Sequence, residues 1–100
     1  DRLLARVMDL QVQATRRIDT GPFNRALESW VTRTPPPQHR NKPVRIRYGL
    51  QTGTAPQRFR IYISRGRPLA EAYRRYIINS IRTEFALQHV PVVLDVNNGG

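Results

Sequence analysis

The stretch VRIRYGLQTGTAPQRFRIYIS, residues 44–64, decides the fold, because two alternating segments flank a turn-forming one. Successive side chains of a strand point to opposite faces of a sheet, so alternation indicates a half-buried strand. The apolar positions expected to face the core are Val44, Ile46, Tyr48 and Leu50 in the first segment, and Phe59, Ile61 and Ile63 in the second. The sequence TGTAP between them favours a turn, so the stretch predicts an antiparallel β-hairpin.

The polar positions of this hairpin carry arginine. They are Arg45, Arg47, Arg58 and Arg60, and the alternation predicts them on one face. No carboxylate occurs between Glu28 and Glu71, whereas this interval contains the cations Arg33, Arg40, Lys42, Arg45, Arg47, Arg58, Arg60, Arg65 and Arg67. A one-sided basic surface suits nucleic acid, an anionic lipid surface or an acidic protein face. The alternative is a solvated basic surface without a ligand.

Length and composition limit the class of protein. A chain of 100 residues that is 39 % hydrophobic can bury a single modest core, so we expect one small domain. It contains no cysteine, which excludes disulfides and thiolate metal sites. No apolar run approaches the roughly 18 to 20 residues that cross a bilayer, and no signal-peptide pattern is present. We therefore expect a cytoplasmic protein with no membrane partner.

Two helices are predicted before the hairpin. Residues 2–17 have an apolar stripe at helical spacing. The segment TGPFNRALESWVTR, residues 20–33, has a second stripe, with Thr20 as a candidate N-cap and Pro22 in the first turn. Both helices would place an apolar face on the sheet.

The remaining segments complete the predicted order. TPPPQHRNKP, residues 34–43, contains four prolines and predicts a semi-rigid extended connector. PLAEAYRRYIINSIRTEFAL, residues 68–87, predicts a third helix, and VPVVLDV, residues 90–96, a third strand.

The resulting fold class is α+β, with the order α-α-β-β-α-β. A strand, helix, strand passage crosses over right-handed, so the third strand should lie parallel to the second and make a three-stranded mixed sheet. Helices should pack on one face and leave the arginine face open. Asp95, on the arginine side of the third strand, could neutralise one of the arginines.

Several blocks of the chain, in order, also resemble a known family: ATRRIDTGPFNRALESWV, TPPP, RIRYGLQTGTAPQRFRIYIS, YRRYIINSIRTEF and VPVVLDV. They are similar to the C-terminal domain of the bacterial Der (EngA) GTPases, which have two tandem G domains. The resemblance runs from Thr15 to Val96 and implies a KH-like fold. It further implies that residues 1–17 are the terminal helix of the preceding G domain, that 18–96 are the KH-like domain, and that 97–100 are a disordered tail.

The family resemblance implies a role in assembly of the large ribosomal subunit. The expected partners are ribosomal RNA, the large ribosomal subunit and the G domains of the same chain, with a monomer as the expected state. In one hypothesis the basic face binds RNA phosphates. In the other, the domain is regulatory, packs on its own G domains and couples nucleotide state to ribosome binding. The parent protein would be a GTPase that uses GTP and Mg.

The candidate RNA-binding residues are the cations of the hairpin and its flanking loops: Arg40, Lys42, Arg45, Arg47, Arg58, Arg60, Arg65 and Arg67. Tyr62 shares the arginine face and is a candidate for base stacking. True KH domains clamp RNA with a GxxG loop, which is absent from this sequence; SRGRPL, residues 64–69, is the nearest substitute.

No catalytic or metal site is predicted for this segment. His39 and His89 are 50 residues apart without a carboxylate pair at ligand spacing. No GxxxxGK[ST] phosphate loop occurs, and Lys42 follows no glycine-rich turn. We therefore expect no enzymatic activity and no cofactor in this part of the protein.

Overall fold

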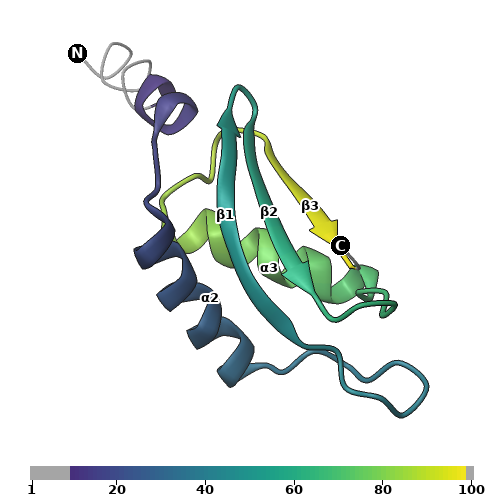
Figure 1. The fold of residues 1–100 in the computed structure, drawn as a ribbon. Helices are drawn as coiled ribbons and strands as arrows, with labels where there is room; N and C mark the ends of the chain where they lie inside the picture. Colours follow the sequence, from purple (N-terminus) through teal and green to yellow (C-terminus); the bar gives the residue numbers. More distant parts are fainter. Residues whose placement is uncertain (1–9, 99–100) are drawn as a thin grey trace.

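The structure is a computed structural model that describes residues 10–98. Residues 10–15 are helical, and the elements that follow are α2 (Thr20–Arg33), β1 (Ile46–Thr54), β2 (Gln57–Ile63), α3 (Glu71–Glu84) and β3 (Val92–Asn97) (Figure 1). This order confirms the predicted α+β class. Most of the predicted helix 2–17 lies outside the described residues.

The sheet has the predicted topology. Its order is β1-β2-β3, with β1 antiparallel to β2 and β2 parallel to β3. Helix α3 forms the crossover between the two parallel strands, and α2 packs beside β1 (Figure 1). The central strand β2 therefore has a hydrogen-bonded neighbour on each side.

The hydrophobic core lies between the helices and one face of the sheet. Along β2, buried residues alternate with half-buried ones, as the hairpin pattern predicts. Phe23 of α2 stacks on Phe59 of β2 with ring centroids 5.3 Å apart and meets Trp30 edge-on at 6.2 Å. Ile77 and Ile81 of α3 are fully buried in the same cluster. The arginines between the buried positions of β2 are consequently directed away from the helices.

The prediction for β1 was wrong from Tyr48 to Gln51. Ile46 pairs with Ile63, but Tyr48 pairs with Tyr62, so Arg47 is the extra residue of a β-bulge. A one-residue shift exchanges the two faces of a strand. Tyr48, predicted in the core, is therefore 48 % exposed on the opposite face, and Leu50 also lies on that face, opposite Arg60.

The bulge brings Gly49 to the core-facing position. A Cβ atom there would lie 2.7 Å from Phe23 and 2.9 Å from the carbonyl oxygen of Arg60. Asn24 of α2 also forms two 2.8 Å hydrogen bonds with Gly49, accepting from its N–H and donating to its carbonyl. Helix α2 can approach the outer edge of β1 this closely because Gly49 has no side chain.

Several predicted boundaries also change. Thr20 is the first residue of α2 rather than its cap; Asp19 is the N-cap, and its side chain makes no capping hydrogen bond. Helix α3 is shorter than the predicted 68–87. The predicted tail was to begin at residue 97, but Asn97 belongs to β3, and the Asn98 carbonyl accepts a 2.8 Å hydrogen bond from Gly66 N–H.

The connector 34–43 is not simply extended. His39 and Lys42 exchange two backbone hydrogen bonds of 2.9 and 3.0 Å around Arg40 and Asn41. Both central residues have positive φ, 51° and 63°, as in a type I′ hairpin turn. The connector thus folds into a small arm with Arg40 at its tip.

Two tyrosines of α3 hold the C-terminal end of α2. Tyr73 Oη donates to the Thr34 carbonyl at 2.6 Å, and Tyr76 Oη donates to the Trp30 carbonyl at 3.0 Å. Thr34 is the C-cap of α2, and Trp30 lies in the last turn, where its carbonyl also accepts the N–H of Thr34. The two tyrosines therefore add side-chain donors at the end of this helix. Burial, with the adjacent Tyr76 as a second cause, raises the pKa of Tyr73 to about 12.

Candidate nucleic-acid interface

We define the open face as the side of the sheet opposite α2 and α3. On β2 its residues are Arg58, Arg60 and Tyr62; their register partners on β1 and β3 are Gly53, Leu50, Tyr48, Val93, Asp95 and Asn97. None of these nine is buried. The structure thus confirms that Arg58 and Arg60 lie on the face that the helices leave open. It also places a second tyrosine, Tyr48, beside Tyr62 on this face.

One of the two β2 arginines is neutralised. Arg58 Nη1 lies 3.1 and 3.3 Å from the two carboxylate oxygens of Asp95. Both side chains remain partly exposed, so solvent screens this ion pair. Within residues 10–98, no carboxylate lies within ion-pair distance of Arg60. The prediction that Asp95 could relieve one arginine is confirmed.

Tyr48 and Tyr62 form an aromatic pair across β1 and β2. Their ring centroids are 4.5 Å apart and their planes differ by 17°, so the rings are stacked. The side chains point to the same face only because the bulge at Arg47 shifts β1 by one residue. Strict alternation therefore missed Tyr48; Gly49, a glycine inside the strand pattern, is the signal in the sequence that points to a bulge near this position.

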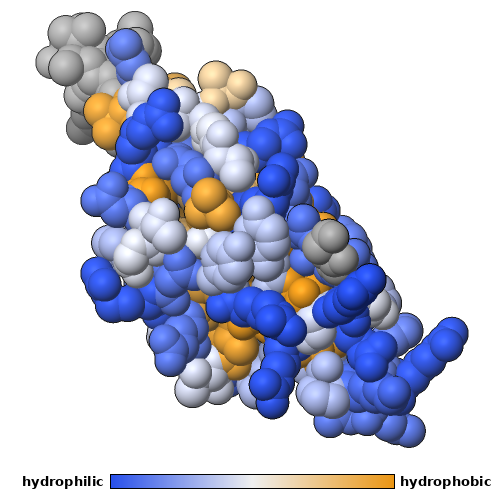
Figure 2. Space-filling view, in the orientation of Figure 1, coloured by the Kyte–Doolittle hydropathy of each residue, from blue (hydrophilic) through white to orange (hydrophobic). Residues whose placement is uncertain are grey.

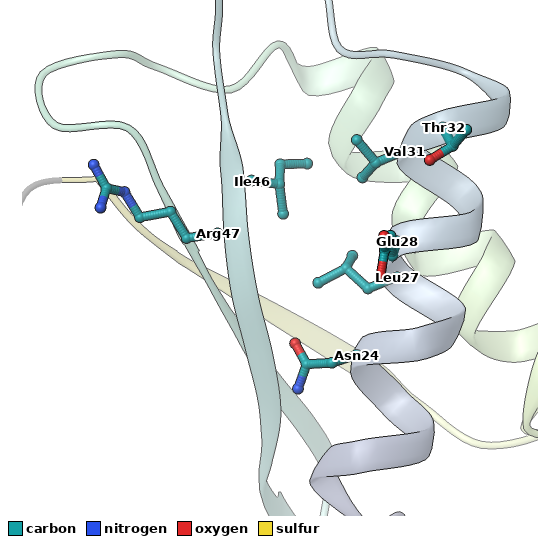
Figure 3. A pocket seen from close by; sticks show the side chains of 7 residues that line it. All are labelled: Asn24, Leu27, Glu28, Val31, Thr32, Ile46 and Arg47. Atoms are coloured by element: carbon teal, nitrogen blue, oxygen red, sulfur yellow. The ribbon is translucent and has the colours of Figure 1, made fainter.

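Arg45 directly precedes β1 and Arg47 is the second residue of this strand; both are exposed. The backbone of Arg45 makes two hydrogen bonds with Ser64. Its N–H donates to Ser64 Oγ at 2.6 Å, and its carbonyl accepts from the Ser64 N–H at 2.8 Å. Arg47 extends from β1 away from α2, whereas Ile46 points toward Leu27 (Figure 3). Arg47 points away from the core because it follows the inward-facing Ile46 in the strand, and the bulge changes the facing only from Tyr48 onward.

A groove separates α2 from β1 and is shown in Figure 3. Its volume is about 320 Å³, and its lining residues are Asn24, Leu27, Glu28, Val31, Thr32, Ile46 and Arg47. The Asn24 amide is already engaged with Gly49. The groove has one cation and one acid in its lining, so it does not form a concentrated anion site.

The other predicted cations gather at one end of the molecule. Arg40 and Lys42 lie on the arm, and Arg65 and Arg67 lie in the loop between β2 and α3; both segments lie toward the lower right of Figure 1. The same end is almost uniformly hydrophilic in Figure 2. The Arg45–Ser64 contacts connect the two segments. We call these four side chains the basic end.

Other arginines have structural roles. Arg74 donates to the Leu94 carbonyl on β3, and Arg82 donates to the Val90 carbonyl at 3.1 Å. Both arginines belong to α3. Arg74 thereby holds α3 to β3, and Arg82 holds it to the segment just before β3. Their guanidinium groups already donate to backbone carbonyls of this chain, which distinguishes them from the arginines of the open face.

Two glutamine side chains, Gln51 and Gln57, which the sequence patterns did not single out, connect the segment before α2 to the hairpin. Gln57, 1 % exposed, donates to the carbonyls of Gln13 and Arg16 at 2.8 and 3.0 Å. Gln51 accepts from Ile18 N–H and donates to the Arg16 carbonyl, both at 2.9 Å, and also donates to Gln57 Oε1. Buried amides require such partners. The residues just before α2 are thereby fixed to the turn end of the hairpin.

In the described part of the chain, no three side chains of His, Cys, Asp or Glu gather as metal ligands. No helix among these residues is both long and apolar enough to span a membrane. The chemistry that the open face and basic end do offer is cationic and aromatic.

The element order and the mixed sheet define a KH-like α+β domain. The family described as the KH-domain-like C-terminal domain of EngA bacterial GTPase enzymes matches residues 17–96, and the chain belongs to this family. Its relatives include proteins named GTPase Der. That of Hyphomonas neptunium is 35 % identical over 99 residues, 99 % of this chain and 19 % of the relative. That of Azorhizobium caulinodans is 35 % identical over the whole chain and 22 % of the relative. The chain thus spans about a fifth of these relatives.

Proposed function

We propose that this domain binds ribosomal RNA through its open face and basic end, as the C-terminal part of a GTPase that acts in assembly of the large ribosomal subunit. The observation that carries the proposal is the direction of Arg58 and Arg60: they alternate with the buried core of β2 and lie on the face that α2 and α3 leave uncovered. Arginine binds phosphate through a planar fork of donors, often bidentately.

The proposed binding is electrostatic and weakly selective for base sequence. The loop between β2 and α3 contains Gly66 but no GxxG clamp. The cations therefore act mainly on phosphates, and phosphate contacts orient a protein on RNA without reading its sequence. Arg47 and the basic end extend the cationic surface beyond Arg60.

We assign the remaining activities to the longer protein. Residues 1–17 are proposed as the end of a preceding G domain, and GTP and Mg would bind in the G domains, since this sequence has no phosphate loop. The name GTPase Der carried by the relatives supports a GTPase parent. We further propose that the parent protein is cytoplasmic and monomeric.

A second function, regulation by docking on the protein's own G domains, is favoured by the glutamine contacts. Because Gln57 holds the carbonyls of Gln13 and Arg16, a movement of the preceding helix would be transmitted to the hairpin. A change of nucleotide shifts docked and undocked populations only if the two arrangements differ in contacts, by a few kcal/mol for a nearly complete switch.

The test is the double variant Arg58→Glu and Arg60→Glu in the full-length protein, with ribosome association and GTP hydrolysis measured on the same preparation. We expect association to fall while intrinsic hydrolysis changes little. Arg25→Glu with Arg33→Glu is the matched control, because both residues are exposed on α2 and the charge change is equal. Loss of hydrolysis with association intact would contradict RNA binding and support G-domain docking.

A further inference from the structure

We propose that the Tyr48–Tyr62 pair is a stacking platform for an unpaired nucleobase, so that the preferred ligand is RNA with a bulged or single-stranded nucleotide. This inference rests on the proposed RNA binding and specifies its substrate class. It concerns a feature that the β-bulge creates, since without the shift at Arg47 the Tyr48 ring would point into the core.

The geometry leaves aromatic surface available. The two rings are within 17° of parallel, so each gives one face to the other and has its second face directed outward from the pair. Tyr48 is 48 % exposed and lies on β1, an edge strand of the sheet that residues 10–98 form. An aromatic ring in this position can stack on any base, because every base has a π-face.

Cations lie next to the pair. Arg60 is two residues from Tyr62 on the same face of β2, a separation of about 6.6 Å along a strand. Arg47 directly precedes Tyr48, and both are exposed. One nucleotide could therefore stack through its base on the tyrosines while a neighbouring phosphate meets a guanidinium.

A purely structural role would be a cross-strand aromatic pair, which contributes on the order of 0.2 to 1 kcal/mol to a sheet. Such a role needs no exposed ring and no adjacent unneutralised cation. The open face instead combines its most exposed large aromatic, Tyr48, with Arg60, which makes no ion pair among residues 10–98. This combination is typical of surfaces that bind single-stranded nucleic acid.

The experiment uses the 100-residue chain and two RNA hairpins that differ by one unpaired adenosine in the stem. We expect the hairpin with the unpaired base to bind about fivefold more tightly or better. A fluorescent adenine analogue at that position should be quenched on binding. Tyr48→Thr should remove both the preference and the quenching, whereas Tyr48→Phe keeps the ring and should retain both.

Leu50→Ala changes another side chain of the open face and is the control for a general change of this surface; it should keep the preference and the quenching. Thermal unfolding checks that each variant is folded. Equal affinity of the native chain for the two hairpins, or a preference that survives Tyr48→Thr, would overturn the inference. If Arg58→Glu with Arg60→Glu still weakens binding to both hairpins in that case, the proposed RNA binding stands without the stacking platform. If the native chain binds neither hairpin, the proposed function itself fails.

Discussion

The guanidinium of Arg58 bonds both carboxylate oxygens of Asp95, at 3.1 and 3.3 Å, so the acid of β3 cancels one of the two arginine charges that β2 presents on the open face. Asp95 is also the register partner of Arg60. The acid is therefore beside Arg60 in the sheet and ion-paired with Arg58, which limits how strongly this part of the sheet can attract an anion.

Replacing Asp95 with Asn should increase RNA affinity, because Arg58 becomes available for a phosphate. If one more phosphate is neutralised, the slope of log K against log salt steepens by about 1. Binding isotherms at several salt concentrations measure it. Glu71→Gln is the control, since it also removes one acid but from the exposed Glu71–Arg74 pair of α3. Equal effects of the two variants would show that net charge, and not the location of Asp95, is responsible.

Contact between α2 and β1 should depend on Gly49. Gly49→Ala places a Cβ atom 2.7 Å from Phe23, and we expect a loss of about 1 to 3 kcal/mol in the free energy of unfolding from this overpacking. Denaturant titration measures the change. Gly53→Ala is the control, because its nearest neighbouring atom would be 3.9 Å away. A stability unchanged by Gly49→Ala would contradict the close packing on Phe23.

Loss of the glutamine contacts should release the segment before α2. Gln57→Ala leaves the carbonyls of Gln13 and Arg16 without this donor, and we expect a cost of about 1 to 3 kcal/mol. Hydrogen exchange at residues 13–18 should accelerate more than exchange in α3. Uniform acceleration throughout the chain would indicate that Gln57 supports global stability only.

Alkaline pH should destabilise the domain through Tyr73. Its pKa is raised from 10.0 to about 12 by burial, so its contribution is complete below pH 10 and is lost as the pH rises from 10 toward 12. Thermal unfolding across this range should show a falling midpoint. Tyr73→Phe should be less stable at neutral pH, because the bond to the Thr34 carbonyl is lost, but its midpoint should fall less steeply. Equal slopes in both proteins would contradict this role of Tyr73.

Most of the fold could be predicted from the periodicity of apolar residues and from the turn-forming segments between the periodic ones. The alternation in β2 located Phe59 and Ile61 in the core, and the right-handed crossover rule placed β3 parallel to β2. The alternation alone did not locate the bulge. Gly49 marks its neighbourhood in the sequence, but the contacts of Gly49 with Phe23 and Asn24 join residues that are distant in sequence.

The sequence predicted only part of the candidate site, because the shift of β1 at the bulge was not foreseen. Arg58 and Arg60 follow from the alternation of β2, whereas Tyr48 required the one-residue shift of β1. Arg74 and Arg82 look equivalent to the other arginines in the sequence, yet they bind carbonyls of this chain. Only the three-dimensional partners distinguish arginines that are available to a ligand from those that brace the fold.

If the open face and its neighbouring cations bind RNA phosphates, as proposed, the affinity must depend on salt concentration. If about four phosphates are neutralised, log K should fall with log salt at a slope of roughly −3 to −4. Arg45→Glu with Arg47→Glu should weaken binding and flatten that slope, whereas Arg25→Glu with Arg33→Glu should leave the slope nearly unchanged. A slope near zero, or one that the first pair of substitutions does not alter, would contradict phosphate binding by this surface.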